Sequence, residues 1–247
     1  MATYDTLADA YVRRRAASPA TVEALRETGR VGSGSLILEV GAGTGNHSRA
    51  LVEATGCRAV GLEPSRAMLG HARRLGGGVA CVAGDAHALP FRDGVFDLVF
   101  STDVIHHLAR PAAHFREAAR VLSAGGHLIT VTQSHAGIRA RPVLSRFFPE
   151  TVAADIARYP DTLELVRHMA EIGFEAAAER VIETPRVLSD AKAYADKAFS
   201  ALHQIPEAAF RAGLGRLEAA LAEGPLPAPE RASLVVGRKV APGSVSA

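Results

Sequence analysis

Three glycines at alternate positions stand between a short apolar run and a helical pattern. The apolar run covers residues 36–40, the glycines are Gly41, Gly43 and Gly45, and the helical pattern begins at His47. A strand, a glycine turn and a helix in this order bring the N–H groups of a helix N-terminus to the carboxyl edge of a parallel sheet. The spacing predicts a site for a nucleoside-like ligand.

Polar residues around this loop restrict the class of ligand that it can bind. Asn46 stands where the dinucleotide fingerprint needs its third glycine, so the spacing does not fit a NAD site. Glu39 lies within the first strand, and Glu63 closes a second apolar run. A carboxylate at the end of the second strand can accept hydrogen bonds from both hydroxyls of a ribose. The alternative for Glu63 is a solvated residue at a strand end.

Two adjacent histidines, His106 and His107, follow the apolar run 96–101. A histidine with a pKa near ~6.5 suits the removal of a proton from a weakly nucleophilic group at neutral pH. One member of an adjacent pair is often structural, so both catalytic roles stay open. His135, after a later strand, is a third candidate. Asp103 and His107 are four residues apart, but no third ligand at a useful spacing accompanies them, so we expect no metal site.

Composition excludes several classes of function. The 247 residues include 28 basic and 26 acidic side chains, and this balance does not indicate a polyanionic partner. Aromatic residues make up 5% and tryptophan is absent, which leaves few stacking surfaces for nucleic-acid bases. Cys57 and Cys81 are expected to be buried, reduced thiols. The polar start and the lack of a long apolar run predict a cytoplasmic protein without a membrane anchor.

Apolar runs and helical patterns alternate along most of the chain. Predicted strands cover residues 36–40, 57–62, 79–83, 95–101 and 126–133, and predicted helices cover 46–55, 65–75 and 111–122. A helix at 162–171, a strand at 175–182 and a last strand at 233–239 follow. Such alternation requires right-handed crossovers and a parallel sheet that is covered on both faces. The predicted fold class is therefore α/β.

Segments outside this rhythm are predicted to form a helical lid on one domain, residues 1–247. Residues 1–30 carry two helices, the first with Tyr4, Tyr11 and other apolar residues on one face and the second opened by the cap Ser18 before Pro19. Two insertions cover 134–160 and 184–231, and the second holds one helix from Ser189 and another from Pro206. Residues 241–247 are expected to be a flexible tail.

The motifs, taken in order, resemble those of the class I S-adenosylmethionine-dependent methyltransferases. The run Glu39-x-Gly41-x-Gly43-x-Gly45 is similar to the first motif of that family. The run Gly84-Asp85-Ala86-x-x-Leu89-Pro90-Phe91 resembles the small-molecule branch that includes the ubiquinone and menaquinone C-methyltransferases (methyltransferase type 11). The resemblance is strong over about residues 36–133. It implies a Rossmann-like, seven-stranded, mainly parallel sheet whose last strand is antiparallel.

The resemblance also implies a set of cofactor contacts. These are Tyr11, Glu39, Gly41, Ala42, Gly43, Gly45, Glu63, Pro64, Met68, Asp85, Ala86 and Ser101. The glycine motif would hold the methionine part of S-adenosylmethionine, Glu63 the ribose, and Asp85 the adenine amino group. The alternative for Asp85 is the cap of a turn, and the alternative for Met68 is a place in the core.

The function implied is methyl transfer from S-adenosylmethionine to the oxygen, nitrogen or carbon of a small organic molecule. Two alternatives stay open: a cofactor-binding enzyme of other chemistry, such as a cyclase, and a catalytically silent cofactor-binding protein. The expected partner is the acceptor alone, without nucleic acid or membrane, for a monomer or homodimer.

Aromatic residues in the two insertions bear on the acceptor. Phe147, Phe148, Tyr194 and Phe199 predict an apolar lining and hence a largely apolar acceptor. A second set, Arg139, Arg141 and Arg146, offers a partner for a carboxylate on it. The alternative is that the aromatic side chains only attach the lid to the sheet.

Overall fold

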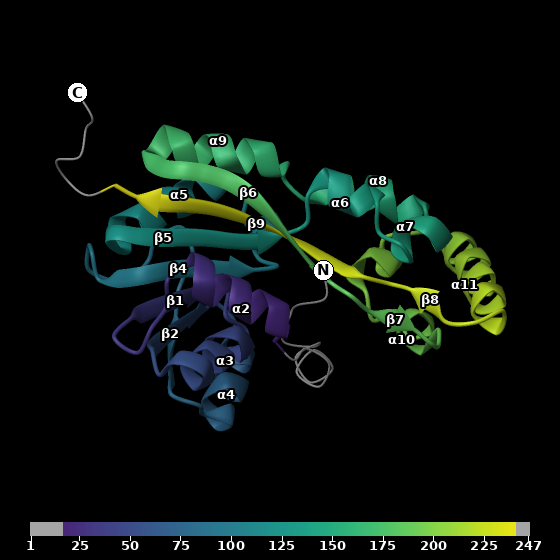
Figure 1. Cartoon of the computed structure of the whole chain (residues 1–247), viewed down its shortest axis with the longest axis horizontal. Helices are drawn as coiled ribbons and strands as arrows, with labels where there is room; N and C mark the ends of the chain where they lie inside the picture. Colours follow the sequence, from purple (N-terminus) through teal and green to yellow (C-terminus); the bar gives the residue numbers. More distant parts are fainter. Residues whose placement is uncertain (1–16, 241–247) are drawn as a thin grey trace. The chain divides into compact units, whose positions relative to one another are not determined.

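The computed structural model describes residues 17–240, and the chain divides into two compact units (Figure 1). The described part of the first unit is residues 17–132, 163–180 and 234–240. The second unit is Gln133–Thr162 and Val181–Ser233. Both segments expected as insertions lie within the second unit. The predicted first helix and Tyr11 lie outside the described residues.

A seven-stranded sheet forms the centre of the first unit. Its strands are β1 (Leu36–Val40), β2 (Arg58–Glu63), β3 (Val79–Ala83), β4 (Phe96–Thr102), β5 (Leu122–Thr132), β6 (Phe174–Thr184) and β9 (Glu230–Lys239). Their order is β3-β2-β1-β4-β5-β9-β6. The pairs among β1 to β5 are parallel, whereas β9 runs against its neighbours (Figure 1). The predicted α/β fold with an antiparallel last strand is confirmed.

The central strands are apolar on both sides because helices cover both faces of a parallel sheet. Ile37 and Leu38 of β1 are both fully buried although they point to opposite faces. Leu38 belongs to a core cluster with Phe96 and Phe115. This core fixes the register of β1, since a slip of one residue would exchange the two faces.

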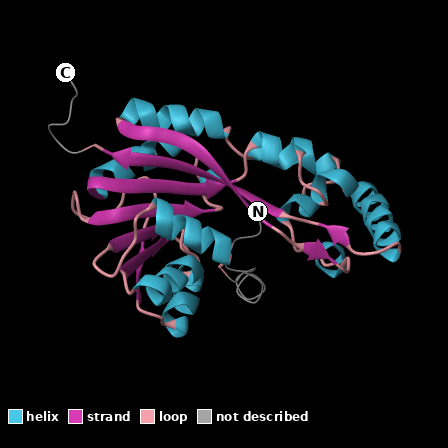
Figure 2. Cartoon of the chain, viewed as in Figure 1, coloured by secondary structure: helices cyan, strands magenta, loops and turns pink. Residues whose placement is uncertain are grey.

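Helices of the first unit follow the sequence pattern closely (Figure 2). They are α2 (Pro19–Thr28), α3 (Asn46–Thr55), α4 (Arg66–Leu75), the short 3₁₀ helix η1 (Ile105–His107), α5 (Pro111–Val121) and α9 (Thr162–Ile172). Ser18 caps α2, because its hydroxyl accepts a hydrogen bond from Thr21 N at 3.4 Å. β5 begins earlier than the predicted strand because it pairs with β4 on both sides of a bulge near Gly125, whose φ is 78°.

The second unit is built from short elements. They are α6 (His135–Arg139), α7 (Leu144–Phe147), α8 (Glu150–Arg158), β7 (Val187–Leu188), α10 (Lys192–Ala195), the 3₁₀ helix η2 (Ser200–His203), α11 (Glu207–Ala222) and β8 (Leu226–Pro227). The continuous helix expected from Ser189 is wrong. Lys197 has a φ of 48°, which a right-handed helix does not allow, so the segment divides into α10 and η2.

Aromatic side chains fill the interior of the second unit. The ring of Phe148 is fully buried and stacks on Tyr194 with centroids 6.0 Å apart and on Phe210 at 6.1 Å. A Cβ on Gly213 of α11 would lie 2.4 Å from Phe148 Cδ1, so this helix approaches the ring closely. Phe147 and Tyr194 are buried in the same cluster, and Phe199 packs against it. These residues form a core, which favours a packing role, and the prediction that they line an apolar pocket stays a prediction.

Two of the three arginines expected to meet a carboxylate on the acceptor have partners within this unit. Arg141 binds the buried carboxylate of Asp155, with Nη1 2.6 Å from Oδ2, and Arg146 lies over the Phe147 ring at 5.0 Å. Arg139 is exposed at the end of α6.

Two further expectations concern thiols and membranes. Cys57 and Cys81 are both free thiols, as predicted; Cys57 is buried, whereas Cys81 is partly exposed. Among residues 17–240, no helix is both long and apolar enough to span a bilayer.

Candidate active site

The glycine loop between β1 and α3 has a backbone that requires its glycines. Gly41, Gly43 and Gly45 have φ values of 68°, 54° and 74°, in the left-handed region that glycine adopts without strain. A Cβ on Gly41 would lie 2.4 Å from Val104 Cγ2. Two turn hydrogen bonds hold the loop against β2, since Gly41 N and Ala42 N both donate to Leu62 O.

The same close approach brings a second segment to the loop. Val104 lies between the end of β4 and η1, so the segment that carries His106 and His107 adjoins the glycine loop at the carboxyl edge of the sheet. Gly45 occupies the N-cap position of α3 and has no side chain to cap the helix, although Glu39 accepts from Ser48 N in the first turn. The N–H groups at a helix N-terminus are suited to an anionic group.

Glu39 is buried at the centre of this edge, with 3% of its surface exposed. Its Oε2 accepts from Ser48 N at 3.1 Å and from Ser48 Oγ at 2.6 Å. Its Oε1 lies 3.7 Å from His47 Nδ1. The carboxylate therefore ties the strand to the first turn of α3 through one oxygen. A contact of Glu39 with a ligand stays a prediction.

Glu63 is held at the end of β2 by backbone donors on two sides. Its Oε2 accepts from Gly43 N at 2.9 Å, and its Oε1 accepts from Ser65 N at 2.9 Å. Only 9% of the residue is exposed, so it is not a solvated strand-end carboxylate. A carboxylate has about four acceptor positions, so each oxygen retains capacity for one more donor.

Residues after Glu63 open the next helix. Ser65 caps α4 by accepting from Met68 N at 3.2 Å, and Pro64 before it is exposed. Met68 is buried with its methyl group 3.3 Å from a Cβ placed on Gly43. Met68 thus belongs to the core beneath the glycine loop, which agrees with the alternative that the sequence left open for it.

Asp85 forms a turn at the end of β3. Its Oδ1 accepts from His87 N at 2.9 Å and lies 2.8 Å from His87 Nδ1. These hydrogen bonds, that of the backbone first, lower the pKa of Asp85 and keep it ionised. The turn-capping role is therefore present, but the side chain is 68% exposed and accessible to a ligand. Ala86 beside it is buried.

The candidate catalytic histidines fall in different units. The rings of His106 and His107 are 4.0 Å apart between centroids, and His107 is the more exposed. His135 is in the second unit, where its Nε2 lies 2.8 Å from Tyr159 O and its Nδ1 3.5 Å from Asp161 Oδ2. Both ring nitrogens of His135 thus have local partners, which favours a structural role.

Ser101 does not reach the surface. It is fully buried on β4, and its hydroxyl lies 3.4 Å from that of Thr130 on the paired position of β5. A side-chain contact with a ligand therefore has no support for Ser101. Groups of three or more metal-ligating side chains are absent from the part of the chain that the structure describes.

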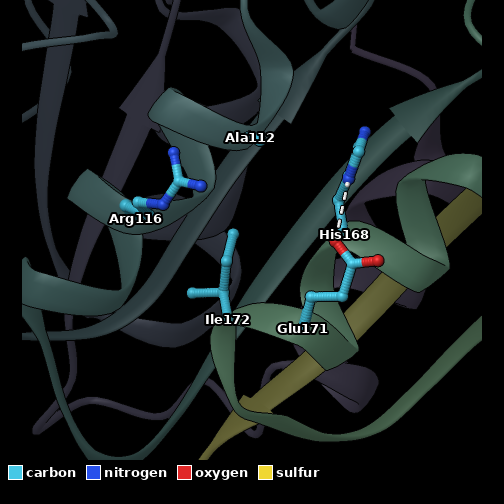
Figure 3. Close-up of a pocket in the computed structure, with 5 residues that line it drawn as sticks. All are labelled: Ala112, Arg116, His168, Glu171 and Ile172. Carbon is cyan, nitrogen blue, oxygen red and sulfur yellow. Dashed lines mark hydrogen bonds and ion pairs between the residues drawn. The ribbon is translucent and has the colours of Figure 1, made fainter.

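One pocket, of about 350 Å³, lies away from these residues (Figure 3). Its lining comes from α5 and α9: Ala112, Arg116, His168, Glu171 and Ile172. The imidazole of His168 lies 3.5 Å from the carboxylate of Glu171. No predicted site residue lines this pocket, and the His168–Glu171 pair lies between side chains that are partly or largely exposed.

Sequence reasoning missed the side chains that hold the turn after β3. His114, Glu117 and Arg120 of α5 bind the backbone of residues 86–91. Their spacing of three places them on one helix face, which is the only signal that the sequence contains. Their partners are backbone atoms, which no residue pattern marks.

Comparison with known proteins gives consistent matches. A family described as "Methyltransferase domain" matches residues 38–130. The demethylmenaquinone methyltransferase of Thermobifida fusca is 31% identical over 214 residues, which are 72% of this chain and 87% of that protein.

Solved structures share the fold. A protein described as a methyltransferase from an antibiotic biosynthesis pathway of Anabaena variabilis has a TM-score of 0.65 at 23% identity, covering 87% of this chain and 96% of its own. The phosphoethanolamine N-methyltransferase 2 of Haemonchus contortus, solved with S-adenosyl-L-methionine, has a TM-score of 0.64 at 19% identity. It covers 97% of this chain and 59% of its own.

Proposed function

The chain belongs to the class I S-adenosylmethionine-dependent methyltransferase family, and from this premise we propose that it methylates a small, largely apolar organic acceptor. The observation that carries the proposal is the buried carboxylate of Glu63, fixed between the glycine loop and the first turn of α4. A nucleoside cofactor needs such an acceptor for its ribose hydroxyls.

The residues at this edge fit the cofactor. The positive φ values of the glycine loop let a ligand approach the backbone closely, and Gly45, the N-cap residue of α3, has no side chain. Ionised Asp85 is exposed at the end of β3 and suits a donor such as an amino group. These features match the donors and acceptors of the amino acid, ribose and adenine parts of S-adenosylmethionine in their chemistry.

S-adenosylmethionine supplies a methyl group on a sulfonium, which is displaced in line by a nucleophile. The protein's part is mainly to fix the orientation, since alignment of two reacting groups supplies a large share of the rate. Glu63 holds the glycine loop through Gly43 N, and Glu39 holds the first turn of α3 through Ser48. His106 or His107 accepts the proton of a hydroxyl acceptor, because their segment adjoins the loop at Val104.

The acceptor is the open part of the proposal. The aromatic residues of the second unit no longer support an apolar acceptor, because they form that unit's core. Support comes from the relative in Thermobifida fusca, whose name gives a quinone acceptor. The more distant Haemonchus contortus protein is named for phosphoethanolamine, which is polar. We therefore give preference to a quinone ring in its reduced, hydroquinone form, in which a phenolic oxygen or a ring carbon attacks the methyl group and loses its proton.

Calorimetry with S-adenosylhomocysteine and a methyl-transfer assay test the proposal together. The first experiment titrates the protein with S-adenosylhomocysteine and with NAD. Binding of the former alone is expected, and binding of NAD alone contradicts the cofactor assignment. The second incubates methyl-labelled cofactor with a demethylated quinone that is kept reduced as its hydroquinone, and with phosphoethanolamine. Label in the quinone supports the apolar acceptor, label in phosphoethanolamine contradicts it, and binding without any transfer over a broad acceptor panel favours the silent alternative.

A further inference from the structure

The turn after β3 has few backbone hydrogen bonds of its own. Between Asp85 and Phe91, Ala88 N donates to Asp85 O at 3.1 Å in an isolated bridge, and Phe91 N donates to Leu89 O at 2.8 Å. α5 adds further support through His114, Glu117 and Arg120. A turn that binds a ligand with a defined orientation needs such support, because an unsupported loop loses conformational freedom when the ligand binds.

Two of the three side chains hold the far part of the turn. Glu117 Oε2 accepts from Leu89 N at 2.8 Å. Arg120 donates to Leu89 O and to Phe91 O, both at 2.8 Å. Glu117 and Arg120 also bind each other, with Nη2 2.8 Å from Oε2. This pair fixes residues 89–91 and does not reach Asp85.

His114 holds the near part of the turn. It is fully buried, and its Nδ1 donates to Ala86 O at 3.2 Å. Because a carbonyl only accepts, Nδ1 carries the proton and Nε2 is an acceptor. Within residues 17–240, Nε2 has no hydrogen-bond partner. Burial lowers the pKa of His114 to about 4, so the ring is neutral at physiological pH. A leucine would bury no unpaired nitrogen, so the donor to Ala86 is what the histidine contributes.

One peptide unit connects His114 to Asp85. The carbonyl of the Ala86–His87 peptide accepts from His114, and the N–H of the same peptide donates to Asp85 Oδ1 at 2.9 Å. Since a peptide unit is planar and rigid, fixing its carbonyl fixes the direction of its N–H. The N–H in turn engages one oxygen of Asp85. His87 Nδ1 also lies 2.8 Å from Asp85 Oδ1, so the position of Oδ2 depends on His87, whose peptide His114 holds.

We propose that His114 is a positioning residue that sets the preference of the cofactor site for adenine, acting on Asp85 through the Ala86–His87 peptide. The inference rests on the proposed function, because it requires the nucleoside to bind at this edge. Adenine presents an amino group to an ionised carboxylate, whereas hypoxanthine presents a carbonyl, which the carboxylate repels. Correct placement of Asp85 Oδ2 thus favours adenine and disfavours hypoxanthine.

Calorimetry with S-adenosylhomocysteine and its inosine analogue measures this preference. The wild type is expected to favour the adenine compound. His114→Leu should reduce the ratio of the two affinities by about 10-fold, which is the size of effect expected for a hydrogen bond to a charged group. His114→Asn should restore the ratio, because its amide nitrogen is as many bonds from Cα as Nδ1 is. Phe115→Leu is the matched control, a fully buried residue of the same helix outside the turn.

The outcomes separate the inference from the proposed function. A wild type that binds neither compound overturns the proposed function. A wild type that prefers adenine, together with a His114→Leu variant of unchanged ratio, overturns the inference alone. An equal loss of affinity for both compounds also overturns it, since that marks a structural role. Should His114→Leu fail to fold, His114→Asn and His114→Gln decide: equal ratios in the two variants overturn the inference, and a higher ratio in His114→Asn supports it.

Discussion

Glu63 and Phe148 were both assigned to ligand sites from residue type, and the structure treats them differently. Glu63 is buried at a sheet edge between two backbone donors, next to a loop with left-handed glycines. Phe148 is buried among other rings in the interior of the second unit. Burial of a carboxylate is costly unless it is hydrogen-bonded, so a buried carboxylate requires specific donors around it. An aromatic ring suits a core and a pocket equally well.

The largest expected effect tests Phe148 as a core residue. Phe148→Ala removes a fully buried ring and should lower the free energy of unfolding by about 3–5 kcal/mol. Affinity for S-adenosylhomocysteine should stay unchanged, because the ring belongs to the second unit. Urea unfolding and calorimetry measure the two quantities. Phe199→Ala, at the partly exposed margin of the cluster, should cost less. Normal stability of Phe148→Ala together with a raised KM for the acceptor would contradict the core role and show that Phe148 lines the acceptor pocket.

The next largest expected effect is a loss of folding stability at low pH. His114 has a pKa of about 4 in the folded protein and an ordinary value of about 6.5 in the unfolded chain. Between these values only the unfolded chain binds the proton, so stability is complete above pH 6.5 and falls as the pH drops to about 4. The loss is on the order of 3 kcal/mol, at about 1.4 kcal/mol for each pH unit. His87 and Glu117 are the charged groups that act on the ring.

Urea unfolding at pH 7 and pH 4.5 measures this loss. His114→Asn cannot titrate and should show a clearly smaller difference between the two pH values. His168→Asn, on the partly exposed side of α9, should behave as the wild type. A wild-type difference in His114→Asn would show that other groups cause the acid sensitivity.

Glu63→Ala tests the assignment of Glu63 to ligand binding. It should weaken S-adenosylhomocysteine binding at least tenfold, because hydrogen bonds to a charged group contribute about 1.5–3 kcal/mol. Glu53→Ala removes an exposed carboxylate of α3 and is the control. Equal affinity of Glu63→Ala and the wild type would refute the assignment of Glu63 to the ribose.

The smallest effect is a coupling between the glycine loop and the histidine segment. Gly41→Ala strains a φ of 68° and places its Cβ against Val104. In the double variant with Val104→Ala most of the steric part should disappear, because only Val104 Cβ, 3.3 Å from the added Cβ, remains. This recovers about 1 kcal/mol of stability, while the backbone strain remains. Thermal unfolding of the four members of the cycle gives the coupling. Strict additivity would mean that the two segments do not touch.

Much of the first unit was predictable because its signals are local. Ser18 before Pro19 defined the start of α2, and the apolar runs defined the five parallel strands. The glycines and Glu63 were recognisable because a left-handed turn and a strand-end carboxylate each require few residue types. Ser101 was harder to predict, since a small hydroxyl residue near a strand end is as easily buried as exposed, and its contact with a ligand stays a prediction.

The second unit and the turn after β3 were harder to predict from the sequence. Lys197 adopts a left-handed backbone that its residue type does not indicate, so the helix from Ser189 was drawn too long. His114 binds a backbone carbonyl 28 residues away, and a carbonyl has no sequence signature. Contacts of this kind depend on the folded path of the chain, which local pattern does not determine.

The path of the chain through the two units bears on how the protein folds. The described chain begins and ends in the first unit and leaves it twice, once after β5 and once within β6. The sheet can therefore form while both excursions remain open loops, because the entropy of closing a loop rises only slowly with its length. The second unit must bring together two stretches that are separate along the chain. Folding is thus expected to start with the sheet. Once the sheet has formed, the two stretches of the second unit are held near each other, and the aromatic cluster can form more readily.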